Sequence, residues 1–424
     1  MKRLLTILAA VGCCSATLGA EPTYSKEIAR LLRDRCEQCH VEGGSAPFTL
    51  GTYSDVRSRA RSIRSAVEAG VMPPWKPEPG VNTFRDSLAL SAAERALLFA
   101  WLDAGAPEGD KADLPEPLPA AGPWPLGEPD VVVEMSKAFE VPAGTDTYRC
   151  FSLPFETPGP RWVSALQIAP GNRDAVHHVL LFVDTSGASA SFEGKDGKPG
   201  YDCFGGPGEG VDEVLGAWVP GFRARPLPEG IGLPVPSAGR LVMQVHYHSH
   251  SGHSQGGAAD RTKVGIYFTP LPPKEELFYI AIEQDQFAIP AGEKKFDVMA
   301  EETIPAFFSV DALVVGPHMH LLGRSIKLEK LKPSPSAESE VLISIKDWDF
   351  NWQNFYTFEK RVTLGGSDRL RLTCTYDNST DNPRNPNQPP KLVTYGEGTT
   401  DEMCLAYIGV LLPAASSGAA LRRF

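Results

Sequence analysis

The stretch Ala312-Leu313-Val314-Val315-Gly316-Pro317-His318-Met319-His320 joins a short apolar run to a pair of histidines. Such a run, closed by glycine and proline, predicts the end of a buried β-strand. Residues two apart in a strand point to the same side, so His318 and His320 can present two imidazoles together while Met319 points away. Imidazole suits copper, zinc, iron and nickel. For an isolated pair, histidines held by core hydrogen bonds are the commoner explanation.

Length and composition limit the possible functions. The chain has 424 residues and a formal net charge of −11. Its length predicts two to four domains at about 150 residues each. The negative charge argues against nucleic-acid binding, which needs a basic face. With 40 Gly and 38 Pro and few long helical patterns, short strands and turns are expected over most of the chain.

Residues 1–20 predict a signal peptide. Lys2 and Arg3 precede an apolar core from Leu4 to Gly12, and Ala20 suits the last position before cleavage. A lipid anchor on Cys13 is an alternative, because the residues before it resemble a lipoprotein cleavage box. No later stretch approaches the ~18 consecutive apolar residues of a spanning helix. We therefore expect an exported protein in a bacterial periplasm or, alternatively, one anchored by lipid to the outer face of a membrane.

Residues 21–107 predict a small all-α domain. Apolar spacing indicates helices near 26–35 and 55–69, and a capping box at Ser91 starts a third. The motif Cys36-Glu37-Gln38-Cys39-His40 follows the first helix and is the attachment signature of c-type haem. Cys36 and Cys39 would bond to the vinyl groups, and His40 would be the proximal iron ligand.

A redox dithiol and half of a zinc site are the alternatives to haem at this motif. No βαβ context supports the first, and no other His or Cys between His40 and Cys150 supports the second. The sixth iron ligand is then a methionine or a histidine. Met72 is the only methionine between Met1 and Met135 and is predicted by elimination.

Beyond a Pro-rich linker over 108–130, the pattern changes to short strands separated by turns. We expect two all-β antiparallel sandwiches of jelly-roll-like type, over 131–275 and 276–412, and a flexible tail over 413–424. The predicted fold class is therefore multidomain, with a small all-α cytochrome c domain followed by two β-domains.

The eight histidines other than His40 fall into three clusters. They are His177 and His178; His246, His248, His250 and His253; and His318 and His320. Such grouping beside apolar strands suggests metal. Adjacent His177 and His178 can share an ion only at a strand end, a bulge or a twist. Spacing alone leaves open one site made by His246, His248, His318 and His320, or two separate sites. After signal cleavage, the four cysteines outside the haem motif predict two disulfides, with three possible connectivities.

Four motifs in order resemble the copper type II, ascorbate-dependent monooxygenases, the peptidylglycine α-hydroxylating and dopamine β-monooxygenase family. The resemblance covers about 129–412, and the motifs are Ala175-Val176-His177-His178-Val179, Leu241-Val242-Met243-Gln244-Val245-His246-Tyr247, His318-Met319-His320-Leu321-Leu322-Gly323 and Asp401-Glu402-Met403-Cys404-Leu405-Ala406-Tyr407.

The resemblance implies two copper ions per chain. An electron-transfer copper would be held by His177, His178 and His246, and an oxygen-activating copper by His318, His320 and Met403. It also implies disulfides Cys374–Cys404 and Cys150–Cys203. His248, His250 and His253 have no counterpart among these ligands.

The reaction implied by the resemblance is hydroxylation of a C–H bond with dioxygen, with electrons arriving singly from an ascorbate-like reductant or a redox protein. In this chain the fused haem is a further candidate donor. Peptide-processing members carry an arginine where this chain has Gly316 and an asparagine where it has Leu405, whereas Tyr407 is retained at a pocket position. We therefore expect a different, less polar small-molecule substrate.

Two other functions are weighed against this one. The first is a non-catalytic haem and copper electron-transfer or copper-handling protein of the same fold. The second is a multicopper oxidase, which is disfavoured because no cysteine lies directly between two histidines.

Overall fold

The computed structural model describes residues 21–42, 44, 46–116, 124–142, 146–204, 206–211, 213–219, 222, 224–247, 259–333 and 339–414. Three groups of sequence-based predictions lie outside these ranges. They are the signal peptide with Cys13, the histidines His248, His250 and His253, and the tail beyond residue 414. Among the described residues, no helix has the length and apolar character needed to cross a membrane.

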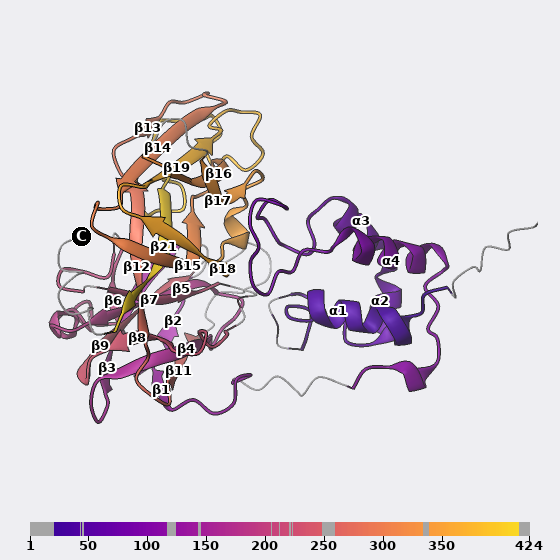
Figure 1. Cartoon of the computed structure of the whole chain (residues 1–424), viewed down its shortest axis with the longest axis horizontal. Helices are drawn as coiled ribbons and strands as arrows, with labels where there is room; N and C mark the ends of the chain where they lie inside the picture. The colour runs from indigo at the N-terminus through magenta and orange to yellow at the C-terminus, as the bar shows by residue number, and fades with distance from the viewer. Residues whose placement is uncertain are drawn as a thin grey trace, which may run out of the picture. The chain divides into compact units, whose positions relative to one another are not determined.

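The described residues form two compact units. A helical unit takes residues up to Val41, Phe48–Pro73, and the described residues from Ala89 on to Glu116. A β unit takes residues 42–47 as far as they are described, Pro74–Leu88 and the described residues from Trp124 onward. Figure 1 shows the helices and strands of the two units.

The helical unit packs around a small core that includes Ile28, Leu32, Leu98 and Trp101. Its elements are the π-helix Tyr24–Ile28, α1 (Ala29–Arg35), α2 (Tyr53–Ser58), α3 (Ala60–Glu68), α4 (Ala92–Asp103) and the 3-10 helix Lys111–Asp113. The capping box predicted at Ser91 is present, because Ser91 and Glu94 each bond the other's backbone N–H.

The helix expected over 55–69 is interrupted at Arg59, which leaves the helical region with φ −108° and ψ 9°. The Arg59 guanidinium lies 4.5 Å from the centre of the Phe48 ring, and this contact accompanies the break.

The first half of the β unit contains strands β1 to β11. They are β1 (Val131–Glu134), β2 (Phe139–Glu140), β3 (Thr147–Glu156), β4 (Arg161–Ala169), β5 (Val176–Asp184), β6 (Tyr201–Asp202), β7 (Glu213–Trp218), β8 (Ile231–Val235), β9 (Ala238–Tyr247), β10 (Ala259–Asp260) and β11 (Lys263–Phe268), with a 3-10 turn at Ala188–Ser191. A five-stranded sheet has the order β6-β3-β9-β5-β7. Its central strand β9 is buried without interruption from Leu241 to Tyr247, which explains its apolar sequence.

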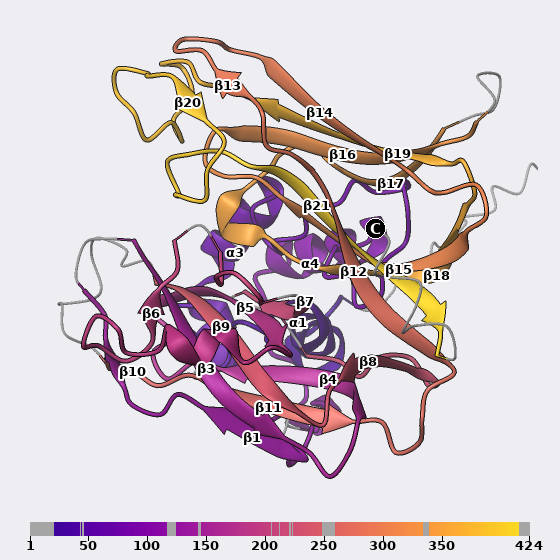
Figure 2. The same ribbon diagram turned by 90° about the vertical axis from the view of Figure 1, so that its left-hand side faces the viewer.

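The second half contains β12 to β21. They are β12 (Glu275–Gln284), β13 (Ala288–Ile289), β14 (Phe296–Thr303), β15 (Ser309–His318), β16 (Gly323–Leu331), β17 (Glu340–Ile345), β18 (Tyr356–Gly365), β19 (Arg369–Tyr376), β20 (Val393–Thr394) and β21 (Cys404–Pro413), with a 3-10 turn η4 at Phe350–Trp352. Figure 2 shows β14, β19, β16 and β17 as one layer over β12, β21, β15 and β18.

One eight-stranded sheet runs through both halves, in the order β1-β11-β4-β8-β12-β21-β15-β18. The halves join where β8 pairs in parallel with β12, through Ile231 with Glu275 and Gly232 with Glu276. One buried apolar cluster lies mainly in each half, and the cluster of the first half also takes in Leu277, Leu313, Val314 and Leu411 from the second. The predominantly β architecture expected from the sequence is confirmed, with the added feature that the two halves share a sheet.

The segment Pro74–Leu88 lies in sequence between α3 and α4 but belongs to the β unit. The Glu78 N–H donates to the Ser344 carbonyl at 2.8 Å, and the Arg85 N–H donates to the Thr357 carbonyl at 2.8 Å. Trp75 meets Tyr356 edge-on at 5.2 Å between ring centres. Residues expected to lie within the helical domain therefore add to the second half of the β unit.

Candidate metal centre

The first histidine cluster forms across two neighbouring strands. His177 and His178 lie on β5, and His246 lies opposite on β9. The pairing shifts between Val176, opposite Tyr247, and His178, opposite His246, so His177 is an extra residue on β5. This bulge is one of the arrangements that let adjacent histidines face one site.

The ring nitrogens of this cluster converge. The Nδ1 atom of His178 lies 3.1 Å from Nδ1 of His177 and 3.4 Å from Nδ1 of His246. One nitrogen from each ring lies within 4.8 Å of the others. Burial, followed by the neighbouring histidines, holds the pKa of His178 well below its usual value. Neutral imidazole is the form that binds a metal.

Two neighbours orient His246. The Tyr148 ring stacks on it, with 4.2 Å between ring centres and 8° between planes. On its far side, the Nε2 atom of His246 lies 3.4 Å from a carboxylate oxygen of Asp146. Contacts of this kind on the outer nitrogen fix the ring orientation of metal-binding histidines.

The second cluster lies where β15 ends. The Nε2 atoms of His318 and His320 face each other at 3.2 Å. The outer nitrogens are occupied, because Nδ1 of His318 bonds the Gln353 side-chain oxygen and Nδ1 of His320 bonds the Asp401 carbonyl at 3.1 Å. Burial lowers the pKa of His318 to about 4 and that of His320 to about 3. Both rings are therefore neutral at neutral pH, and the lone pairs of their Nε2 atoms converge on one position.

Met403 comes to this cluster from a distant part of the chain. It immediately precedes β21, which pairs with β15 so that Leu405 lies opposite His318. Met403 and both histidines line the same pocket. The disulfide Cys374–Cys404 ties the start of β21 to β19. Met319, by contrast, is fully buried in the core of the second half, as the strand alternation predicted.

Glu402 holds the backbone of the loop that carries His320. Its two carboxylate oxygens accept hydrogen bonds from the backbone N–H groups of His320, at 2.9 Å, and Leu322, at 2.5 Å. Burial raises the pKa of Glu402 to about 8, and these N–H donors oppose the rise. The sequence offered no signal for this role except that Glu402 precedes Met403.

Both clusters face one cavity of about 200 Å³, whose lining includes His178, His318, His320 and Met403. His246 lies with His177 and His178, so the structure separates it from the pair His318 and His320. Two sites, and not one four-histidine site, account for the described histidines of the β unit.

The wall of this cavity beside His318 is aromatic. A side chain at Gly316 would meet the Phe355 ring, since a Cβ there would lie 2.7 Å from its nearest carbon. Phe355 in turn stacks against Tyr407, with 6.1 Å between ring centres and 22° between planes. Burial raises the pKa of Tyr407 to about 12, so it presents a neutral hydroxyl. Leu405 lines the same cavity.

The cysteines divide as expected. Cys150–Cys203 and Cys374–Cys404 are disulfides, which confirms the predicted pairing.

Cys36 and Cys39 belong to the helical unit and take part in neither disulfide. His40 is buried, and its Nδ1 atom bonds the Phe48 carbonyl at 3.0 Å. Since that bond occupies Nδ1, Nε2 is the nitrogen that can bind iron.

The donor sets fit the groups expected from the sequence. Neutral imidazoles and a thioether suit copper. Two thiols outside disulfides, followed by an oriented histidine, suit covalently attached haem.

Known proteins resemble parts of this chain. Residues 277–414 match the family model "Copper type II ascorbate-dependent monooxygenase, C-terminal domain". DBH-like monooxygenase protein 1 of Gallus gallus is 25% identical over 302 residues, covering 64% of this chain and 45% of its own length. Dopamine beta-hydroxylase of Rattus norvegicus is 24% identical over 306 residues, covering 63% of this chain and 44% of its own. Peptidyl-glycine alpha-amidating monooxygenase A of Xenopus laevis is 27% identical over 297 residues, covering 68% and 29%.

The chain thus spans less than half the length of these relatives. Residues 277–414 are similar to the C-terminal domain of the copper type II ascorbate-dependent monooxygenases, a copper-dependent family.

Proposed function

We propose that this protein is a copper-dependent monooxygenase that hydroxylates a C–H bond of a small organic substrate with dioxygen. The observation that carries the proposal is the pair of unlike donor sets that face one cavity. Three imidazoles from His177, His178 and His246 suit a copper that relays single electrons. Two imidazoles and the Met403 thioether leave coordination positions open and favour Cu(I), the state that reacts with dioxygen.

The chain's own residues hold this arrangement. Gln353 and the Asp401 carbonyl fix the rings of His318 and His320 through their outer nitrogens. The disulfide at Cys404 holds the strand that follows Met403. The bound copper would supply the redox chemistry, and the protein supplies the placement of donors and substrate.

The cavity suits a small substrate that lacks a carboxylate. Its volume of about 200 Å³ is below the ~300–1,000 Å³ of typical ligand pockets. Apart from histidines, the charged side chain among its described lining residues is Glu397, an acid. The position that would carry a carboxylate-binding arginine is Gly316, and Phe355 fills the space beside it. A neutral apolar molecule would lie against Phe355 and near the Tyr407 hydroxyl.

The test is product formation under labelled dioxygen. Copper-loaded protein with an ascorbate-like reductant is incubated with a panel of neutral aromatic and aliphatic compounds, and one labelled oxygen atom per product is sought by mass spectrometry. Met403→Leu should abolish product, because leucine keeps the volume but lacks sulfur. Met319→Leu is the matched control and should retain activity. Copper binding and oxidation without substrate-dependent oxygen uptake would favour the non-catalytic electron-transfer or copper-handling alternative.

We further propose that the helical unit carries one c-type haem that donates electrons to the copper sites. Cys36 and Cys39 would bind it covalently, with His40 and Met72 as axial ligands. The oriented ring of His40 supports this reading. A haem attached in this way and an export signal together suggest a bacterial periplasm.

Two measurements test the haem proposal. Denaturing gel electrophoresis should show covalently bound haem, which Cys36→Ala with Cys39→Ala should eliminate while copper stoichiometry stays at two. Stopped-flow mixing of fully reduced protein with oxygen and substrate should then show haem oxidation during product formation. Haem that stays reduced while product appears would rule out electron supply through the haem.

A further inference from the structure

One aromatic side chain touches both histidine clusters. Phe350 is the first residue of η4 and is buried, with 6% of its surface exposed. Its ring stacks on His177, with 5.0 Å between ring centres and 17° between planes. The same ring meets His320 edge-on at 5.7 Å and 83°. His177 comes from the first half of the β unit and His320 from the second, so Phe350 spans the gap between the two sites.

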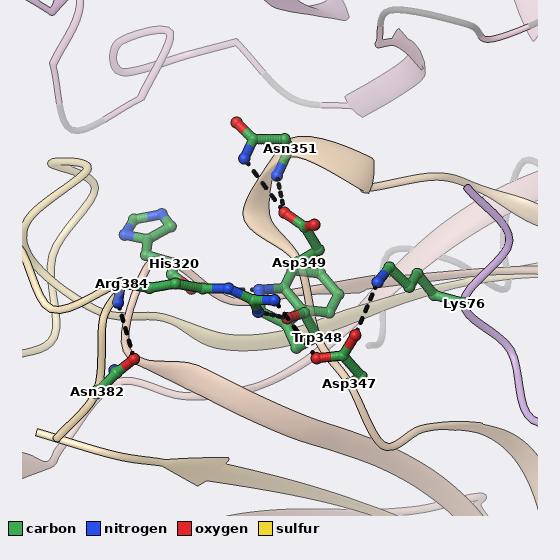
Figure 3. A network of polar contacts seen from close by, with 8 residues as sticks. All are labelled: Lys76, His320, Asp347, Trp348, Asp349, Asn351, Asn382 and Arg384. Carbon is green, nitrogen blue, oxygen red and sulfur yellow. Dashed lines mark hydrogen bonds and ion pairs between the residues drawn. The ribbon is translucent and has the colours of Figure 1, made fainter. Parts of the chain in front are cut away.

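The turn that carries Phe350 is held by its neighbours on both sides (Figure 3). The Asp349 carboxylate accepts hydrogen bonds from the backbone and side-chain N–H groups of Asn351, at 3.1 and 3.2 Å, and so caps η4. The Trp348 indole N–H donates to the His320 carbonyl at 3.2 Å. The residues around Phe350 are thus attached directly to the second histidine cluster.

Further contacts hold Asp347 and Trp348, the residues that lead into η4. The Arg384 guanidinium donates to the Trp348 carbonyl, and the Arg384 backbone N–H donates to the Asn382 side-chain oxygen at 3.0 Å. Lys76 forms an ion pair with Asp347 at 3.0 Å. Figure 3 shows these residues in one continuous network with His320. A ring on a turn fixed in this way has a defined position between the clusters.

We propose that Phe350 is a positioning residue that sets the separation of the two copper sites and forms the contact through which single electrons pass between them. The proposal rests on the proposed copper function. In each transfer, one electron leaves the site of His177, His178 and His246, whose copper goes from Cu(I) to Cu(II). The electron arrives at the site of His318, His320 and Met403, which is reduced by one electron. No covalent bond is made or broken in this step.

Three features make Phe350 suited to this task. Its ring is in van der Waals range of one imidazole from each site, so no solvent layer need be crossed. Phenylalanine has no polar group, so it leaves the metal-facing nitrogens of His177 and His320 available. Aromatic pairs prefer either the stacked or the edge-on geometry, and Phe350 makes one of each.

The test uses protein loaded with two Cu(II) ions per chain. Pulsed EPR measures the magnetic coupling between the ions, and hence their separation. Rapid-freeze EPR after addition of one electron equivalent measures how fast the electron redistributes. Phe350→Leu removes the aromatic contacts but keeps an apolar side chain. Phe350→Tyr keeps the ring and is the matched control.

In Phe350→Leu we expect the ratio of molecules at the wild-type copper separation to molecules at other separations to fall about two- to tenfold, from the size of aromatic pair terms. The redistribution rate should fall by at least the same factor. Phe350→Tyr should stay within about twofold of the wild type in both measurements. Wild-type separation and rate in Phe350→Leu would overturn the bridging role. Failure of the wild-type protein to bind two copper ions would instead refute the copper function on which it rests.

Discussion

Replacement of Glu402 by glutamine should show how strongly the second site depends on a buried carboxylate. Glu402 is fully buried and accepts hydrogen bonds from the backbone N–H groups of His320 and Leu322 through separate oxygens. Glutamine keeps one acceptor oxygen and places an amide NH₂ against the other N–H. Above the pKa of about 8, where the Glu402 carboxyl is ionised, one buried donor is then left without an acceptor, a loss of about 1–3 kcal/mol. Glu402→Ala leaves both donors without an acceptor, so it should cost about twice as much.

Urea unfolding of the copper-free protein at a pH above the Glu402 pKa of about 8, followed by circular dichroism of the β-sheet signal, measures this loss. Glu301→Gln is the matched control. Glu301 is a half-exposed carboxylate that pairs with Arg369 and Arg371 on the sheet surface. An exposed pair is worth about 0–1 kcal/mol, so the control should change little.

The same variant has a second readout at the metal. If Glu402 holds the loop of His320 in place, X-ray absorption of the copper-loaded Glu402→Gln protein should show fewer histidine ligands or a lost sulfur ligand at the second site. Unfolding of Glu402→Gln within about 0.5 kcal/mol of the wild type, with unchanged copper ligands, would refute the positioning role, since even one unsatisfied buried donor should cost more.

Three further perturbations test other parts of the structure. Burial lowers the pKa of His318 to about 4. Between about pH 6.5 and pH 4 the unfolded chain therefore binds a proton at this histidine that the folded copper-free chain does not. The free energy of unfolding should fall as the pH falls through this range, by up to about 1.4 kcal/mol per pH unit. His318→Gln should remove that part of the slope in urea titrations at several pH values, and an unchanged slope would contradict it. Gly316→Arg combined with Phe355→Ala should create binding of an aromatic carboxylate by calorimetry, whereas Gly316→Arg alone should not, because Phe355 occupies the space. Removal of the Cys150–Cys203 disulfide, which closes a loop of 53 residues, should destabilise the first half of the β unit by about 4 kcal/mol, and a thermal transition unchanged on reduction would argue against that estimate.

The cavity wall gives a physical basis for the proposal that the substrate lacks a carboxylate. A glycine at position 316 allows Phe355 to approach the β15 backbone and stack on Tyr407. The resemblance implies an arginine at this position in peptide-processing relatives; in this chain that position has no cation, and Phe355 fills the space beside it. A substrate carboxylate would lose its water there without gaining a partner, and this carries a free-energy cost.

Much of the chain's organisation was accessible from the sequence. Local periodicity predicted the helix after Ser91, the strands around Val179 and Leu241, and the opposite directions of Met319 and its neighbouring histidines. These features depend on residues within one turn or one strand, and such local preferences survive folding. The resemblance of the motifs gave the disulfide pairing and the grouping of histidines that spacing left open.

Other features depend on contacts between residues far apart in the chain, and only the tertiary structure decided them. The bulge that lets His177 and His178 face one point is a property of the pairing between β5 and β9. The parallel pairing of β8 with β12 joins the two expected sandwiches through one shared sheet. Pro74–Leu88, which local pattern placed in the helical domain, belongs to the β unit. The placement of Phe350 between two histidine clusters required both halves to be folded. The sequence by itself determined which side chains could bind metal, because donor chemistry belongs to the residue. The tertiary structure decided which of them share a site and what lies between the sites, because proximity is set by strand register and packing.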